Sequence, residues 1–122
     1  MSLIIIIDDD PDILEASSLT LESKRFRVLT AQDVDEGYKM IKEEKPDLII
    51  LDVMMEEPDD GFFLAQRLRR ENIQTPILMY TSVSKTMGME FGKNELVPVD
   101  DFVEKPISPK QLIEKVEKLI NN

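Results

Sequence analysis

The sequence predicts a doubly wound α/β fold, in which a five-stranded parallel sheet lies between two layers of helices. Two observations carry this prediction. Short aliphatic runs alternate along the 122 residues with segments of helical periodicity. Several of the runs are apolar at every position, which is typical of strands whose two faces are both covered by helices. Because crossovers between parallel strands are right-handed, this alternation produces a three-layer αβα sandwich.

Five runs along the chain have the length and composition of strands. The first is Leu3 followed by four isoleucines, and β-branched residues of this kind favour a buried strand. Pro76 precedes the fourth run, a position where proline is tolerated. The five predicted strands cover residues 3–7, 26–31, 48–51, 77–80 and 102–103. Their spacing leaves room for a helix after every strand, so five helices are expected.

The intervening segments begin and repeat as amphipathic helices do. Asp10 before Pro11 is a favourable N-cap and first residue, and Asp33 and Ser108 each stand three residues before a Glu or Gln, as in a capping box. The residues expected to face the core are Ile13, Ala16 and Leu21, then Val34, Gly37, Tyr38 and Ile41, then Gly61, Leu64, Ala65 and Leu68, and finally Leu112, Val116, Leu119 and Ile120. Residues 84–99 contain two glycines and a proline, so the fourth helix is expected to be short or irregular.

The composition narrows the possible functions. Acidic residues number 25 and basic residues 15, which gives a net charge of -10. Such a chain lacks the cationic surface that nucleic acids and anionic membranes attract. It contains no cysteine and no histidine, which excludes disulfides, thiolate catalysis, histidine general bases and cysteine-bound zinc. Any bound metal must therefore take oxygen ligands, as Mg²⁺, Ca²⁺ and Mn²⁺ do.

No apolar run is long enough to cross a membrane, since a spanning helix needs about 20 apolar residues. The run at 3–7 has no basic residue before it, so it does not resemble a secretory signal. We therefore expect a cytoplasmic protein whose residues 1–122 form a single domain.

Polar side chains follow the predicted strands. Asp8 and Asp9 come after the first strand, Asp52 after the third, Thr81 after the fourth and Lys105 after the fifth. Ligands of such folds bind beyond the carboxyl ends of the strands, where these side chains should converge. Clustered carboxylates repel one another, and Mg²⁺ relieves that repulsion. A carboxylate can also accept a phosphoryl group, whose oxygens a hydroxyl and an ammonium group can hold.

Taken together, these residues resemble the receiver domain of bacterial two-component response regulators. The resemblance extends from Ile4 to Ile120 and implies a flavodoxin-like fold with strand order 2-1-3-4-5. The matching stretches are Ile-Asp-Asp-Asp-Pro-Asp at 7–12, Pro-Asp-Leu-Ile-Ile-Leu-Asp-Val-Met-Met at 46–55, Asp-Gly at 60–61, Pro-Ile-Leu-Met-Tyr-Thr-Ser at 76–82 and Asp-Asp-Phe-Val-Glu-Lys-Pro at 100–106. Each stretch is a weak signal alone, but their order and spacing together make a specific one.

The resemblance implies a role for each acidic residue of the site. Asp52 would be the phosphoacceptor. Asp9 would be a direct ligand of Mg²⁺, which Mn²⁺ could replace. Asp8 would act mainly through a water molecule bound to the ion. Asp52 and the backbone carbonyl of Met54 would complete the protein ligands.

The resemblance further implies a switch and its partners. Thr81 would bind a phosphoryl oxygen and move on activation, Lys105 would pair with the phosphoryl group, and Phe102 would be the aromatic switch residue. A histidine kinase or phosphotransfer protein would supply the phosphoryl group. Phosphorylation would alter the contacts of this domain with other proteins, including homodimerisation. The domain would catalyse no reaction other than its own phosphorylation and dephosphorylation. No output domain is expected in this chain, which would act alone or as part of a longer protein.

The sequence departs from the family pattern at three places. The stretch 56–61 is one residue longer and more acidic than usual. Ser82 stands where alanine is common, and Phe102 stands where tyrosine is frequent, so the switch residue has no hydroxyl.

Arg67, Arg69 and Arg70 are expected to form a solvated helix face.

Two other functions remain open. A receiver-like interaction module that is never phosphorylated would suit the acidic stretch 56–61. A magnesium phosphohydrolase of the haloacid dehalogenase type would suit the Asp-x-Asp pattern at 8–10. The chain leaves no room for that family's cap domain, however, and its lysine follows every acidic motif.

Overall fold

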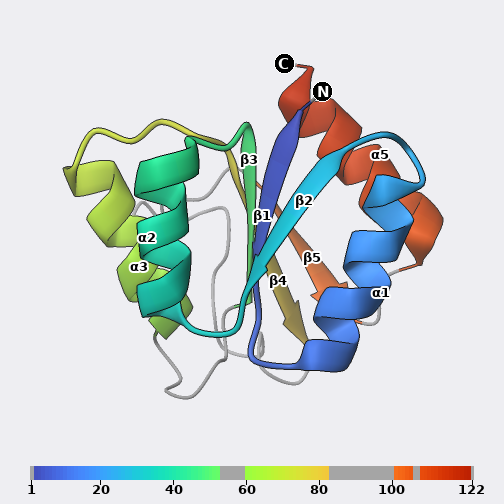
Figure 1. Ribbon diagram of the computed structural model, residues 1–122, viewed down its shortest axis with the longest axis horizontal. Helices are drawn as coiled ribbons and strands as arrows, with labels where there is room; N and C mark the ends of the chain where they lie inside the picture. The colour runs from blue at the N-terminus through green and yellow to red at the C-terminus, as the bar shows by residue number, and fades with distance from the viewer. Residues whose placement is uncertain (1, 53–59, 83–100, 106–107, 122) are drawn as a thin grey trace.

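The computed structural model describes residues 2–52, 60–82, 101–105 and 108–121. Its core is a parallel sheet of five strands in the order β2-β1-β3-β4-β5, as the resemblance implied (Figure 1). The strands are β1 (Leu3–Ile7), β2 (Arg27–Ala31), β3 (Leu48–Asp52), β4 (Ile77–Ser82) and β5 (Asp101–Lys105). The described helices are α1 (Pro11–Glu22), α2 (Val34–Glu44), α3 (Asp60–Arg70) and α5 (Pro109–Ile120). The predicted helix at 84–99 lies outside the described residues.

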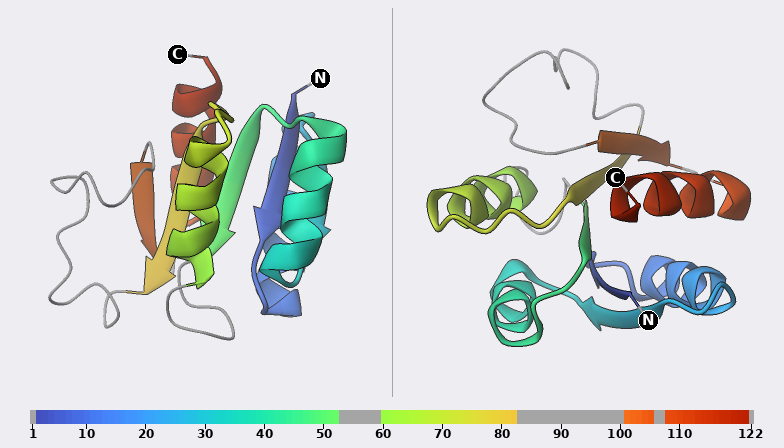
Figure 2. Two further views of the ribbon diagram at one scale, coloured as in Figure 1. Left: turned by 90° about the vertical axis from the view of Figure 1, so that its left-hand side faces the viewer. Right: turned by 90° about the horizontal axis from the view of Figure 1, so that it is seen from above.

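Helices cover both faces of the sheet, which confirms the three-layer prediction. Helices α1 and α5 lie on one face, and α2 and α3 lie on the other (Figure 2). Successive residues of β1 and β3 alternate between the two apolar layers, because neighbouring side chains of a strand point to opposite faces. Every residue of both strands is therefore buried, and β1 and β3 form the centre of the core.

The strand boundaries differ slightly from those predicted. β1 has the predicted bounds, whereas Phe26 lies outside β2. β3, β4 and β5 each continue into polar residues, because parallel pairing persists to Asp52 opposite Tyr80 and to Ser82 opposite Lys105. The polar residues predicted to follow these strands are therefore their last members.

Helix α1 begins as predicted but buries a different stripe. The Asp10 carboxylate accepts hydrogen bonds from the N–H groups of Asp12 and Ile13, at 2.9 and 3.4 Å. The buried residues are Leu14, Ser17 and Leu21, whereas the predicted Ala16 is exposed and Ile13 is half-buried. Leu21 is buried as predicted, but the rest of the stripe is set one residue further along the helix, at Leu14 and Ser17. The polar Ser17 gives this stripe no hydrophobic signal at its centre. In α2, α3 and α5 the stripes are confirmed wherever the side chains are described.

Arg69 departs from the solvated face that was predicted, and Arg67, although exposed, also has a specific partner. The Arg69 Nη1 atom donates to the backbone oxygens of Ile73 and Thr75, at 2.7 and 2.9 Å, and so holds the turn between α3 and β4. The guanidinium carbon of Arg67 lies 3.8 Å from the centre of the Tyr38 ring, a cation–π contact across to α2. Arg67 and Arg70 are exposed as expected, whereas Arg69 is half-buried.

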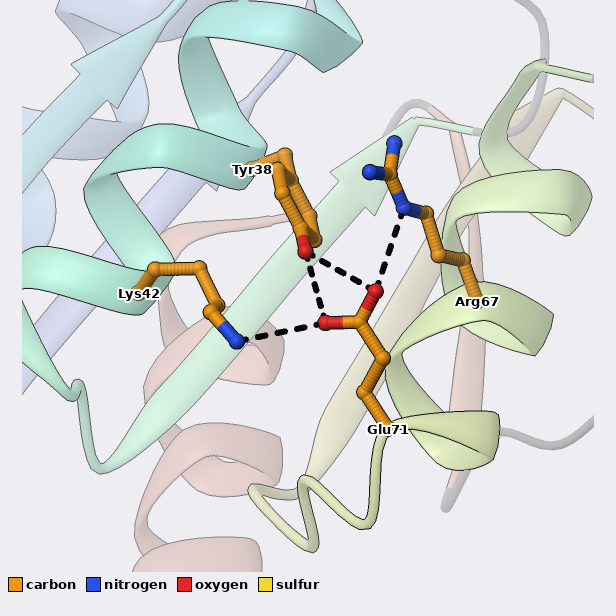
Figure 3. Close-up of polar contacts among 4 residues, drawn as sticks. All are labelled: Tyr38, Lys42, Arg67 and Glu71. Atoms are coloured by element: carbon orange, nitrogen blue, oxygen red, sulfur yellow. Dashed lines mark hydrogen bonds and ion pairs between the residues drawn. The ribbon is translucent and has the colours of Figure 1, made fainter.

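Three side chains surround the carboxylate of Glu71, the residue that follows α3, and so join α2 to the end of α3; we call these four residues the Glu71 clasp (Figure 3). The Tyr38 hydroxyl donates to both carboxylate oxygens, at 2.6 and 2.8 Å. Lys42 Nζ and Arg67 Nε each lie 3.3 Å from one of these oxygens. The Tyr38 hydrogen bond is the main reason that the pKa of Glu71 lies below its ordinary value. Desolvation opposes this shift, and Lys42 and Arg67 add smaller contributions that lower the pKa further.

Gly37 allows α2 to lie close to β1. A Cβ atom at this position would lie 2.8 Å from Ile7 Cγ1, well inside van der Waals contact. Ile7 is fully buried in the layer beneath α2, so its side chain has little room to move. Since Ile7 directly precedes Asp8, the packing of Gly37 also fixes the backbone that leads into the acidic residues after β1.

Among the described residues, no helix has the length and apolar character that crossing a membrane requires.

The first prediction concerns Gly37→Ala. We expect the free energy of unfolding to fall by about 1–2 kcal/mol, because overpacking a core costs more than the better helix propensity of alanine returns. Urea denaturation followed by circular dichroism measures this change. Ile7→Val removes the terminal methyl group that the added Cβ at position 37 would otherwise meet. The double variant should therefore lose less stability than the sum of the losses in the two single variants. Strict additivity would contradict the packing argument.

The second prediction concerns Tyr38→Phe, which removes the main cause of the lowered Glu71 pKa. A carboxyl group with a lowered folded-state pKa stabilises the protein above its unfolded pKa of about 4.3, and this stability is lost as the pH falls through the folded value. The loss of stability caused by Tyr38→Phe should therefore be larger at neutral pH than near pH 3. Urea denaturation at both pH values measures the difference. In a Glu71→Gln background the effect of Tyr38→Phe should not depend on pH, and an unchanged dependence would contradict the prediction.

Candidate functional site

Three carboxylates come together where β1 and β3 end. Oxygen atoms of Asp8, Asp9 and Asp52 all lie within 4.8 Å of one another. The side chains of Asp8 and Asp52 are buried, at 2% and 4% exposure, whereas Asp9 is exposed. Among the described residues, no other acidic group joins this cluster, so it contains the three acids that the strand ends predicted.

The backbone around Asp8 is fixed from both sides. Its N–H donates to the Ala31 carbonyl at 3.1 Å, which extends the pairing of β1 with β2 by one residue. Its carboxylate oxygen Oδ1 accepts from the N–H of Asp10 at 2.9 Å, a local turn typical of aspartate. The Asp8 side chain is therefore directed toward the cluster before any ligand binds.

Asp52 owes its place to the centre of the sheet. It is the last residue of β3, which pairs with β1 on one side and β4 on the other. Residues 48–51 of the same strand are between 0% and 1% exposed, so Asp52 is a carboxylate at the end of a fully apolar strand. Its position cannot shift without moving the buried strands at the centre of the sheet.

Asp10 has a separate function from its acidic neighbours. Its carboxylate is occupied by the first turn of α1, where it caps the helix. The run of three aspartates thus divides into two that face the cluster and one that starts a helix, as the sequence predicted.

The arrangement suits a hard divalent cation. Three carboxylates this close repel one another, and two of them are screened only weakly because they are buried. Oxygen donors with open positions toward solvent are what Mg²⁺ and Mn²⁺ bind. The described residues therefore fit such an ion, which when bound would neutralise charge between Asp52 and an incoming anion.

The remaining predicted site residues are placed less fully. Thr81 is the second-to-last residue of β4. Lys105 is the last residue of β5 and lies opposite Ser82. Both therefore lie at the carboxyl ends of the strands, as Asp52 does and as predicted, although their side chains are outside the described set. Phe102 lies in β5 opposite Met79, and its side chain is likewise undescribed. Met54 falls outside the described residues.

Comparison with known proteins identifies the family. The model of the response regulator receiver domain matches residues 4–117. This chain belongs to that family. Membership confirms the expected fold and the expected signalling role as a receiver domain of two-component response regulators.

Relatives of known function are similar over almost the whole chain. The alkaline phosphatase synthesis transcriptional regulatory protein PhoP of Bacillus subtilis is 35% identical, covering 96% of this chain and 48% of the relative. The phosphate regulon transcriptional regulatory protein PhoB of Pseudomonas aeruginosa is 32% identical, covering 96% of this chain and 51% of the relative. The chain thus spans about half the length of these curated relatives.

Solved structures agree with the observed fold. The chemotaxis response regulator CheY4 of Vibrio cholerae superimposes with a TM-score of 0.86 at 28% identity, covering 98% of each chain. A Francisella response regulator receiver domain gives 0.84 at 26% identity, covering 99% of this chain and 98% of the other.

The third prediction tests the acidic cluster as a metal site. Asp9→Asn should weaken Mg²⁺ binding about tenfold or more, because it removes one of three converging charges. Isothermal titration calorimetry is the suitable measurement, since the chain has no tryptophan to report binding by fluorescence. Asp10→Asn is the matched control, because asparagine caps a helix as well as aspartate and Asp10 lies outside the cluster. Equal affinities for the two variants would contradict this assignment.

Proposed function

We propose that Asp52 accepts a phosphoryl group and that Asp8 and Asp9 hold the Mg²⁺ ion needed for this transfer. The close approach of the three carboxylates, within 4.8 Å, is the observation that carries the proposal. The receiver family supplies the reaction class. The ion supplies charge neutralisation between two anions, which phosphoryl transfer requires.

The transfer exchanges one bond to phosphorus for another. A carboxylate oxygen of Asp52 forms the new bond to phosphorus, while the bond from phosphorus to the donor nitrogen breaks and its electron pair stays on that nitrogen. The reaction creates an aspartyl phosphate. Because Asp52 ends a buried strand, its attacking oxygen is held in one orientation, which lowers the entropic cost of the step.

The other strand ends would bind the transferred group. We propose that Lys105 pairs with the negative charge of the phosphoryl group and that Thr81 binds one of its oxygens. Both residues lie at the carboxyl ends of their strands, as Asp52 does. The backbone carbonyl of Met54 would be a further ligand of the ion. Movement of Thr81 toward the phosphoryl group would in turn draw Phe102 inward, and these two residues would form the switch.

The switch would act through protein contacts. We propose a histidine kinase or phosphotransfer protein as the donor and a protein as the downstream target, with homodimerisation as one outcome of phosphorylation. A net charge of -10 disfavours direct contact of this domain with nucleic acid. The relatives named above are transcriptional regulators about twice as long, so any DNA contact would be made by chain outside this domain. Residues 1–122 would then act as one domain with no turnover of outside substrates.

An interaction module that is never phosphorylated is the second candidate. The acidic stretch 56–61 favours it, because added negative charge after Asp52 would repel an incoming phosphoryl donor. The haloacid dehalogenase alternative is disfavoured by membership of the receiver family.

The fourth prediction separates these candidates. Incubation with acetyl phosphate and Mg²⁺ should add the mass of one phosphoryl group to the wild-type protein and none to Asp52→Asn, as measured by intact-mass spectrometry. Asp12→Asn is the control, because Asp12 is an exposed residue outside the cluster, and its variant should be phosphorylated like the wild type. Addition to Asp52→Asn would show that the acceptor is another residue. No addition to any of the three proteins would favour the unphosphorylated module.

A further inference from the structure

A pocket of about 220 Å³ lies between α1 and β2, on the flank of the sheet. The residues that line it are Pro11, Leu14, Glu15, Ser18, Thr30 and Gln32. Pockets for drug-sized ligands are usually about 300–1,000 Å³, so this one suits a single long side chain better than a nucleotide or cofactor. Neither the phosphoryl chemistry nor the acidic cluster uses any of these six residues.

The pocket borders an open edge of the sheet, because β2 is the outermost strand next to β1 (Figure 2). On the β1 side, the Arg27 N–H donates to the Ser2 carbonyl, and the Ala31 carbonyl accepts from the Asp8 N–H. Alternate residues of a parallel strand point their backbone groups to opposite sides, so those of Val28 and Thr30 point away from β1. A backbone edge of this kind can pair with an added strand.

Thr30 connects the edge with the pocket. Its backbone groups point to the open edge, and its side chain lies on the α1 face, where it lines the pocket. A strand added beside β2 would lie about 4.8 Å away. Every second side chain of that strand would then project toward α1, within reach of the pocket.

The lining favours a positively charged side chain with an apolar stem. Glu15 is the charged residue among the six, and Pro11 and Leu14 offer apolar surface. Helix α1 also carries Asp12 and Glu22, and the segment Pro11–Glu22 contains no lysine or arginine. Lysine and arginine have both the apolar stem and the cationic head that such a surface accepts.

The hydroxyl of Ser18 adds an unsatisfied polar group. Its Oγ atom is buried and, within the part of the chain that the structure describes, has no hydrogen-bond partner. Buried polar groups nearly always have partners. Because Ser18 lines the pocket, a hydrogen-bond donor on an occupant could supply the missing partner.

We propose that the edge of β2 and the adjoining pocket bind an extended, basic segment of a partner protein as an added strand, with one lysine or arginine side chain seated against Glu15. Backbone pairing along Val28 and Thr30 would provide affinity, and the pocket would select the side chain. This site is separate from the phosphoryl chemistry, so it does not depend on the proposed function.

The fifth prediction tests this groove with a synthetic probe. The capped peptide Ac-Thr-Val-Lys-Val-Thr-NH2, titrated to millimolar concentration into the ¹⁵N-labelled chain, should produce saturable shifts of the Val28 and Thr30 amide signals. The same peptide with glutamate in place of lysine should bind about tenfold more weakly, because it meets Glu15 with like charge.

Variants distinguish the groove from general attraction to an acidic protein. Glu15→Gln should weaken binding of the lysine peptide about threefold or more, whereas Glu22→Gln, on the same helix outside the pocket lining, should not change it. Thr30→Pro removes an outward N–H at an edge position that tolerates proline, and it should abolish binding while the signals of α5 stay unchanged.

Three results would overturn the proposal. The first is the absence of saturable shifts in β2. The second is equal weakening by Glu15→Gln and Glu22→Gln, which would show a general charge effect. The third is a response confined to the amides around Asp9, which would show that the peptide binds only at the acidic cluster. If Thr30→Pro fails to fold, the comparison of the two glutamate variants still decides.

Discussion

The pairing of β1 with β3 is the constraint on which the rest of this structure depends. These two strands are buried along their full length, and their register sets Ile7 opposite Leu51. The next residue along the chain after each of these two is an aspartate, so the pairing that buries the core also brings Asp8 and Asp52 together. The repulsion between these carboxylates is opposed by the burial of two aliphatic strands, and a bound cation would relieve it.

The sequence alone predicted the sheet and the acidic cluster for the same reason. Uninterrupted aliphatic runs such as Leu3–Ile7 identify strands covered on both faces, and the residues after such strands must meet at one edge. Local signals also identified the caps at Asp10 and Ser108, because capping depends on residues that are close in sequence. Boundaries were less accurate, since the ends of β3 to β5 are set by pairing with a neighbouring strand.

Contacts between distant residues could not be predicted in this way. The partner of Tyr38 lies 33 residues along the chain at Glu71, and nothing in either local pattern indicates the other. Arg67 and Arg69 resemble a solvated face when the helix is considered alone, yet each has a specific partner in the fold. Ser17 escaped notice because a hydrophobic pattern cannot identify a buried hydroxyl. The packing of Gly37 on Ile7 likewise depends on how closely α2 approaches the sheet.

Helix α1 links the two surfaces to which we assign binding. Its N-cap, Asp10, is hydrogen-bonded to Asp8 of the acidic cluster, and the residue after the cap, Pro11, lines the pocket beside β2. A segment seated in that pocket would contact the first turn of α1 and therefore the backbone that positions Asp8. Coupling between two sites is reciprocal, so any effect of an occupant on metal affinity must equal the effect of the metal on the affinity for that occupant. The structural basis for such an effect is the hydrogen bond from the Asp10 N–H to the Asp8 carboxylate, because a shift of the cap would move the carboxylate that it holds.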